Sequence, residues 1–419
     1  MLRSLKLGSW FLVVSFPLVL SALALVERTP AQPGSGESTK RPAPEAAGAR
    51  LQVKGLFCPF CGGSIEKKLL RLPGVAEVGA NWRSGEVLVR FQPGQPVAEK
   101  DLEDGVKAAG FTAEKIVFEP GDPLESFVAP APGPPRTVAD PAPGILEESV
   151  FSPGTLRRPQ ALARGPDGTL WIADTENRRI VHAAPDGALL GTLSPKGLTR
   201  PSGIDVARDG TLAITDFLGD RIWLLRPDGK VLSRIGSSGR GPGQLDAPAD
   251  VLFLPDGTLL VVEFQGSRLQ RFNRQGQSLA VVTGEGTEPG RFTYPTKLQL
   301  LKDARVRVSD SYAHRVVTLD ESYQPSATIG KSGRHPGDLQ IPGGVASVGD
   351  DLWIADFDNH RVTVLKSDGA FVKVLMRTEK GGLDFDRPVD MAASPDGRTV
   401  YVLDWAHSEI HRLSLEAAP

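Results

Sequence analysis

Residues 353–362 have the sequence Trp-Ile-Ala-Asp-Phe-Asp-Asn-His-Arg-Val, and the acid of this stretch recurs at a regular interval along the chain. The aligned acids stand at positions 174, 216, 263, 310, 356 and 404, at steps of 42, 47, 47, 46 and 48 residues. A proline precedes each acid by 14 to 16 residues. A fixed period of this length indicates a repeat architecture, in which each unit buries its apolar face against its neighbours.

Each period contains short apolar runs separated by Asp-Gly turns, such as those at 167–168 and 186–187. This pattern predicts four short antiparallel strands per unit, which is the content of one propeller blade. The last unit stops at residues 410–415 without a fourth strand, whereas residues 145–151 precede the first unit as a spare strand. We therefore expect a six-bladed, all-β propeller over 145–416, closed by that spare strand so that no sheet edge stays free.

The repeated pattern resembles the NHL repeat family, most closely at residues 353–362 and, in the first unit, through Asp174, Asn177 and Arg179. The resemblance implies the propeller fold, but one fold hosts many functions. An arginine follows five of the six acids by five residues, and we expect each such pair to fix its loop. The pairs are Asp174 with Arg179, Asp216 with Arg221, Glu263 with Arg268, Asp310 with Arg315, and Asp356 with Arg361.

A second, smaller unit is expected over residues 50–118. Alternating apolar residues at 51 and 53 predict a strand, and the apolar spacing from Ile65 to Leu72 predicts a helix that ends at Pro73-Gly74. Two further strands around residues 84–85, a helix over 97–109 and a last strand over 112–118 complete the order βαββαβ. This order predicts an α+β, ferredoxin-like domain.

The small unit resembles the heavy-metal-associated domain family, which includes copper chaperones. The matching residues are Gly-Leu-Phe-Cys-Pro-Phe-Cys at 55–61, Leu-Pro-Gly-Val at 72–75 and Gly-Phe at 110–111. Leu56 stands where that family usually has Met, and Phe57 where it usually has Thr, Ser or His. These departures bear on the identity of the metal rather than on the fold.

The chain has two cysteines, Cys58 and Cys61, so a disulfide framework is excluded. Two thiolates at a helix N-terminus suit a soft ion that accepts linear coordination, Cu(I) first and Hg(II) second. Zn(II) prefers four ligands and would need side chains from a partner. Two alternatives stay open, namely thiol redox exchange and a local disulfide outside the cytoplasm.

The N-terminal residues 1–26 combine Arg3 and Lys6 with an apolar run over 7–26. This pattern predicts an export signal or, if uncleaved, a membrane anchor, and hence a periplasmic or other extracytoplasmic location. Residues 27–49 and 119–144 are rich in Pro and Ala and predict linkers. A net charge of −2, with scattered charges, argues against a nucleic-acid partner.

The propeller offers two candidate sites. The residue after the acid is aromatic in four units, and these side chains are expected to form a rim for a protein or apolar ligand, or to pack between blades. They are Phe217, Phe264, Phe357 and Trp405. On the innermost strands, Asp205, Asp250 and Asp390 are candidates for a central Ca(II), an ion that the NHL resemblance associates with hydrolases and lyases.

The sequence contains no positive sign of catalysis. Its six histidines do not recur as the set that a catalytic zinc needs, and no Ser-His-Asp arrangement is evident. The first hypothesis is therefore a non-enzymatic, exported metal-binding protein whose propeller docks a protein partner. A propeller hydrolase or lyase with a central Ca(II) and a thiol redox protein are the alternatives.

Overall fold

The computed structural model describes residues 46–56, 59–81, 84–126, 145–282, 284–285, 291–376 and 383–416. The expected signal segment 1–26, most of both expected linkers, and Phe57 and Cys58 lie outside these residues. Within the described part of the chain, no helix is long and apolar enough to cross a membrane.

The first domain has the predicted order βαββαβ, which confirms the ferredoxin-like fold class. Its elements are β1 (Gly48–Lys54), α1 (Pro59–Leu69), β2 (Val75–Asn81), β3 (Glu86–Phe91), α2 (Glu99–Ala108) and β4 (Thr112–Glu119). The sheet order is β2-β3-β1-β4, with antiparallel neighbours. Strand β1 begins at Gly48, slightly before the expected boundary, and a 3₁₀ turn η1 (Pro123–Ser126) lies within the expected second linker.

The small domain buries one face of its sheet under its helices. Leu51 and Val53 of β1 are buried while Gln52 and Lys54 are exposed, as strand alternation requires. Helix α1 buries Ile65 and Leu69 completely. The chain leaves α1 through a turn in which Gly74 has φ +87°, a conformation that strongly favours glycine.

The propeller consists of six four-stranded sheets among the described residues, and we number them as blades in sequence order. Blade 1 is β6 (Ala161–Arg164), β7 (Leu170–Asp174), β8 (Arg179–Ala183) and β9 (Leu189–Leu193); blade 2 is β10 (Pro201–Val206), β11 (Leu212–Asp216), β12 (Arg221–Leu225) and β13 (Val231–Ile235). Blade 3 is β14 (Pro248–Phe253), β15 (Leu259–Glu263), β16 (Arg268–Phe272) and β17 (Ser278–Val282).

Blades 4 to 6 repeat the same order. Blade 4 is β20 (Lys297–Leu300), β21 (Val306–Asp310), β22 (Arg315–Leu319) and β23 (Pro325–Ile329); blade 5 is β24 (Pro342–Val348), β25 (Asp351–Asp356), β26 (Arg361–Lys366) and β27 (Phe371–Leu375). Blade 6 is β28 (Pro388–Ala393), β29 (Thr399–Asp404), β30 (Glu409–Leu415) and β5 (Ile145–Phe151). Between blades lie the short pair β18 (Gly284–Glu285) and β19 (Arg291–Phe292), and the 3₁₀ turns η2 (Ser311–Ala313) and η3 (Phe357–Asn359) follow β21 and β25.

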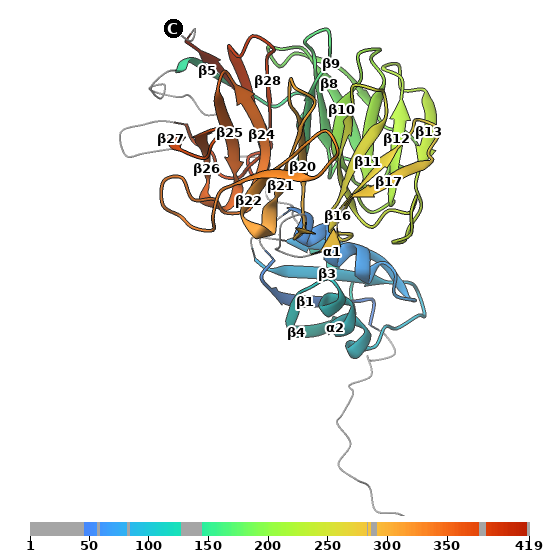
Figure 1. Ribbon diagram of the computed structural model, residues 1–419. Helices are drawn as coiled ribbons and strands as arrows, with labels where there is room; N and C mark the ends of the chain where they lie inside the picture. Colours follow the sequence, from blue (N-terminus) through green and yellow to red (C-terminus); the bar gives the residue numbers. More distant parts are fainter. Residues whose placement is uncertain are drawn as a thin grey trace, which may run out of the picture. The chain divides into compact units, whose positions relative to one another are not determined.

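The innermost strands form a closed ring. Contacts run from β6 to β10, β14, β20, β24 and β28, and β28 contacts β6 again. Figure 1 shows these strands coloured from green to red in sequence order. The spare strand β5 pairs antiparallel with β30, with Phe151 opposite Ile410. This pairing confirms the expected closure of blade 6.

The second strand of each blade is buried over all or nearly all of its length because neighbouring blades cover both of its faces. All five residues are buried in β7, β11, β15 and β21 alike. These strands are correspondingly rich in Val, Ile and Leu, as expected for doubly covered strands. At the Asp-Gly turns, the Asp carboxylate accepts the N–H two residues on, as Asp167 does from Thr169 at 3.0 Å.

Candidate functional site

The repeated acids anchor the loops that lead into the innermost strands. Asp174 accepts the Arg157 N–H at 2.7 Å, and Asp356 accepts the Gln340 N–H at 2.7 Å. Four of the five expected ion pairs form, with N···O distances of 2.6 to 2.9 Å: Asp174 with Arg179, Glu263 with Arg268, Asp310 with Arg315, and Asp356 with Arg361.

The fifth expected pair differs. Arg221 donates to the Gly219 carbonyl at 3.0 Å, and Asp216 instead accepts from the Thr199 N–H at 3.0 Å and the Trp223 indole N–H at 3.3 Å. Trp223 stands seven residues after the acid, the position from which Gln270 and Thr363 donate to the acid in blades 3 and 5 alongside the arginine.

Cys61 lies in the first turn of α1 and is fully buried. It is disulfide-bonded, and the chain has one other cysteine, Cys58. The hydroxyl of Tyr312, from η2 of blade 4, lies 2.6 Å from Cys61 Sγ. Burial raises the pKa of the Tyr312 hydroxyl. Cys61 of the small domain therefore lies against a neutral phenol of the propeller.

Phe60 extends from the same turn into a group of aromatic rings. Its ring centroid lies 5.6 Å from that of Phe217 and 5.4 Å from that of Phe264. The ring centroid of Tyr294 lies 4.9 Å from that of Phe264. Helix α1 can approach because it has Gly63 at the contact, where an added Cβ would lie 2.9 Å from the Phe217 ring.

The four aromatic residues predicted as a rim thus divide into two pairs. Phe217 and Phe264 surround Phe60, whereas Phe357 contacts Trp405 with a centroid distance of 5.9 Å. All four are buried. The face of the propeller that carries the acid loops is consequently covered, over blades 2 to 4, by α1 of the small domain.

Charges of α1 are paired across this contact. Lys67 is 3% exposed, and its ammonium donates to Asp220 and, at 2.8 Å, to Asp246. Although burial acts to raise the pKa of Asp246, the charge and hydrogen bond of Lys67 lower it. Arg200 pairs with Glu66 at 2.5 Å, and Gln265 donates to the Ser64 hydroxyl at 2.8 Å.

The three acids predicted for a central ion line one cavity, and each connects neighbouring blades by accepting a backbone N–H. Asp205 accepts the Phe253 N–H at 2.7 Å, Asp250 accepts the Leu298 N–H at 3.0 Å, and Asp390 accepts the Leu162 N–H at 3.0 Å. The buried Lys297 ammonium donates to Asp390 at 2.8 Å. Among the described residues, no group of three or more His, Cys, Asp or Glu side chains is placed to hold a metal ion.

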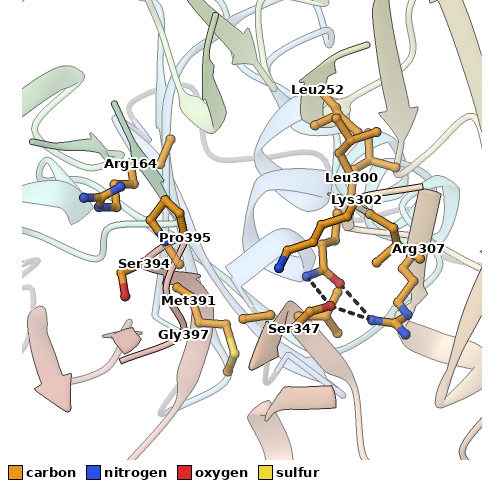
Figure 2. Close-up of a pocket in the computed structure, with 18 of the residues that line it drawn as sticks. Arg164, Leu252, Leu300, Lys302, Arg307, Ser347, Met391, Ser394, Pro395 and Gly397 are labelled. Carbon is orange, nitrogen blue, oxygen red and sulfur yellow. Dashed lines mark hydrogen bonds between the residues drawn. The ribbon is translucent and has the colours of Figure 1, made fainter. Parts of the chain in front are cut away.

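Burial acts on the pKa of two of these acids. It raises the pKa of Asp205 to about 6 and that of Asp250 to about 7, with the charge of Lys297 acting against the rise at Asp250. Both carboxyls line a cavity of about 730 Å³ on the side of the Asp-Gly turns. Figure 2 shows this cavity, with Lys302, Arg307 and Ser347 on one side and Arg164 across from them.

Two regions of the chain match known families. Residues 50–112 match the model of the heavy-metal-associated domain, and residues 339–365 match that of the NHL repeat. The copper chaperone CopZ of Bacillus subtilis (strain 168) is 34% identical over 65 residues, which cover 16% of this chain and 93% of the chaperone.

A much longer relative matches the same region. Copper-transporting ATPase 2 of Homo sapiens is 37% identical over 79 residues, which is 19% of this chain but 5% of the ATPase. Among solved structures, a candidate gluconolactonase superposes with a TM-score of 0.51 at 17% identity, covering 66% of this chain and 94% of that chain. At this identity the likeness shows the propeller fold alone.

Proposed function

We propose, on the premise that this chain belongs to the heavy-metal-associated domain family through residues 50–112, that it captures a soft metal ion at Cys58 and Cys61. Cu(I) is the first candidate and Hg(II) the second. The observation that carries the proposal is the Cys-x-x-Cys sequence at 58–61, whose second cysteine lies in the first turn of α1, in a segment similar to copper chaperones and copper-transporting ATPases.

The donor set fits a two-coordinate ion. Thiolate sulfur is the soft ligand that Cu(I) prefers, and two such ligands suffice for linear coordination. Zn(II) prefers four ligands, and the described residues offer no cluster of three or more candidate side chains. Since Cys61 is disulfide-bonded here, binding requires that a thiol reductant supply two electrons and two protons to give two free thiols.

The test is a Cu(I) titration of the reduced full chain against a chromophoric chelator. We expect one equivalent of Cu(I) in the wild type and none in the Cys58→Ser, Cys61→Ser variant, because no other thiol exists in the chain. Tyr312→Phe is the matched control, since it removes the hydroxyl next to Cys61 and leaves both thiols in place. Stoichiometric binding by the double serine variant would refute the proposal.

We further propose that the acid-loop face of the propeller is a docking platform, and that its first occupant is α1 of the same chain. Full burial of Cys61 supports this, because a metal donor could not reach the sulfur while α1 stays docked. An external protein partner would then compete with α1 for Phe217 and Phe264. The measurement is thiol alkylation of the reduced protein: if Cys61 reacted at the rate of an unfolded chain, docking would not control access.

Export remains part of the proposal and rests on the apolar N-terminal segment. An uncleaved segment would provide the membrane contact. Mass spectrometry of the N-terminus in fractionated cells distinguishes a cleaved signal from an anchor, and full-length protein in the cytosolic fraction would contradict both. The Ca(II)-dependent hydrolase gains no donor set from Asp205, Asp250 and Asp390, whose carboxylates accept backbone N–H groups.

A further inference from the structure

One register position of the propeller carries an unexpected charge. In each blade, the residue three positions before the repeated acid lies on the second strand. Its side chain is buried, and it stands opposite a residue of the innermost strand. Five blades place an apolar or aromatic residue there, namely Trp171, Ala213, Leu260, Trp353 and Tyr401. Blade 4 places Arg307, which is 7% exposed and lies opposite Gln299.

Arg307 has polar neighbours but forms no ion pair with the described residues. Its Nη1 donates to Gln299 Oε1 at 3.3 Å and to Ser347 Oγ at 3.0 Å, and Gln299 Nε2 donates to Ser347 Oγ at 3.2 Å. Its Nε is buried without a hydrogen-bond partner among the described residues. Asp303, an acid that lines the same cavity, pairs with Arg305 at 2.7 Å.

This arrangement is costly for the fold alone. A guanidinium stays protonated in proteins, and a buried charge without a partner costs on the order of several kcal/mol. Two neutral acceptors offset that cost in part. The repeat itself shows that the position can be filled by an apolar side chain, since blade 3 buries Leu260 in the same register. Packing therefore does not explain the charge.

The guanidinium lines the cavity of about 730 Å³, a volume suited to a small molecule. Figure 2 shows Arg307 next to Ser347, with Lys302 on the same side. We propose that this cavity binds a small molecule through a carboxylate that becomes the counter-ion of Arg307, while Gln299 and Ser347 orient the guanidinium. A carboxylate fits the planar donor geometry of arginine, and it can pair with the guanidinium where that group faces the cavity.

The acids of the cavity favour a carboxylate over a phosphate. Seven aspartates line it, among them Asp205 and Asp250, so each negative charge of a ligand meets repulsion there. A singly charged carboxylate adds less repulsion than a doubly charged phosphate. This inference is independent of metal capture, because the described residues that line the cavity include no cysteine.

The test compares thermal unfolding of full-length wild type, Arg307→Leu and Arg305→Gln, with acetate, benzoate or inorganic phosphate added at matched ionic strength. The leucine copies blade 3, and Arg305 is the control because it lines the same cavity but is exposed and paired with Asp303. We expect acetate or benzoate to raise the Tm of wild type and Arg305→Gln by roughly 2 °C or more.

Arg307→Leu separates a ligand-binding role from a structural one. We expect its Tm without additive to equal or exceed that of the wild type, because the unpaired charge is gone, and its response to carboxylates to be lost. A lower Tm without additive would show that Arg307 is structural and would overturn the proposal. So would a carboxylate response that survives in Arg307→Leu or is absent from the wild type. A larger response to phosphate than to either carboxylate would overturn the assignment of the ligand class.

Discussion

The two ends of the propeller differ in how completely their charges are paired. At the acid-loop end, the buried Lys67 ammonium lies between Asp220 and Asp246, and Phe60 fills the space between aromatic rings. At the turn end, a cavity of about 730 Å³ stays open and Arg307 has no ion-pair partner among the described residues. Both ends contain a buried cation. The described residues supply an ion-pair partner to Lys67 at the acid-loop end but not to Arg307 at the turn end.

This difference teaches where to look for ligands. The aromatic residues that follow the acids predict a ligand site on the acid-loop face. In the structure α1 covers that face over blades 2 to 4, whereas the open cavity, lined by the predicted channel acids, lies on the side of the Asp-Gly turns. A face whose charges are all satisfied by its own chain resembles an interior, and a buried charge left without a partner indicates a site that an external group completes.

The largest expected effect comes from Lys67→Met, which removes the buried ion pairs at the acid-loop end. Removing Lys67 leaves Asp220 and Asp246 with the exposed Arg71 and Arg240 as their remaining ionic partners, so we expect docking of the small domain to weaken by about 3 kcal/mol. Urea unfolding should then show an earlier first transition for the small domain. Reduced Cys61 should also become faster to alkylate.

Lys68→Met is the matched control for that variant. Lys68 is the next residue of α1, is half-buried and forms no ion pair with the described residues. We expect its effect to stay below about 1 kcal/mol. Equal effects of the two substitutions would contradict a specific role for the Lys67 ion pairs.

A second prediction uses pH to separate the two ends. Burial raises the pKa of Asp250 to about 7 from 3.8, so ionisation of this carboxyl opposes folding, and its contribution to stability falls as the pH rises from about 4 to 7. Asp246 has the opposite sign. Its lowered pKa stabilises docking above about pH 4, and this stabilisation is lost as the pH falls through that lowered value.

Asp250→Asn tests this assignment, because the amide keeps an oxygen to accept the Leu298 N–H. Each unit of pKa difference is worth about 1.4 kcal/mol. We therefore expect the variant to gain stability over the wild type at pH 7, by more than at pH 4.5, in urea titrations at both pH values. A difference between variant and wild type that does not change with pH would rule the assignment out.

The smallest expected effect concerns the loops that the repeated acids anchor. Arg361 bonds Asp356 and three loop carbonyls, whereas Arg221 bonds the Gly219 carbonyl and leaves Asp216 to other donors. We expect Arg361→Ala to cost about 2 kcal/mol, because it leaves a buried carboxylate short of a partner, and Arg221→Ala under about 1 kcal/mol. Thermal unfolding checks the order, and a larger loss in Arg221→Ala would contradict it.

Both folds were predictable because their signals are local. The acid and proline period, the Asp-Gly turns and the spare strand at 145–151 defined six blades and their closure. The order of strands and helices around Pro73-Gly74 and Ser84-Gly85 defined the small domain. The expectations for residues 1–26 and for Cys58 lie outside the described residues, and the identity of the metal stays a prediction.

The contact between domains left no comparable signal. Lys67 and Asp220 are 153 positions apart, and neither belongs to a repeated motif, so no periodicity relates them. Phe60 lies between the two cysteines of the family motif, a position that predicts a place in the metal-binding loop rather than in a domain contact. Arg307, by contrast, does leave a signal, because aligning the six units places it where five others have apolar or aromatic residues.

The pairing of β5 with β30 also has a consequence for biosynthesis. Phe151 and Ile410 are partners across 259 positions, the difference of their numbers, so β5 leaves the ribosome long before β30 exists. At typical elongation rates the delay is roughly 10 to 50 s. During that interval β5 is an unpaired edge, although it carries Glu148, a charge of the kind that discourages edge-to-edge association. Blade 6 can therefore close only after β30 has been synthesised.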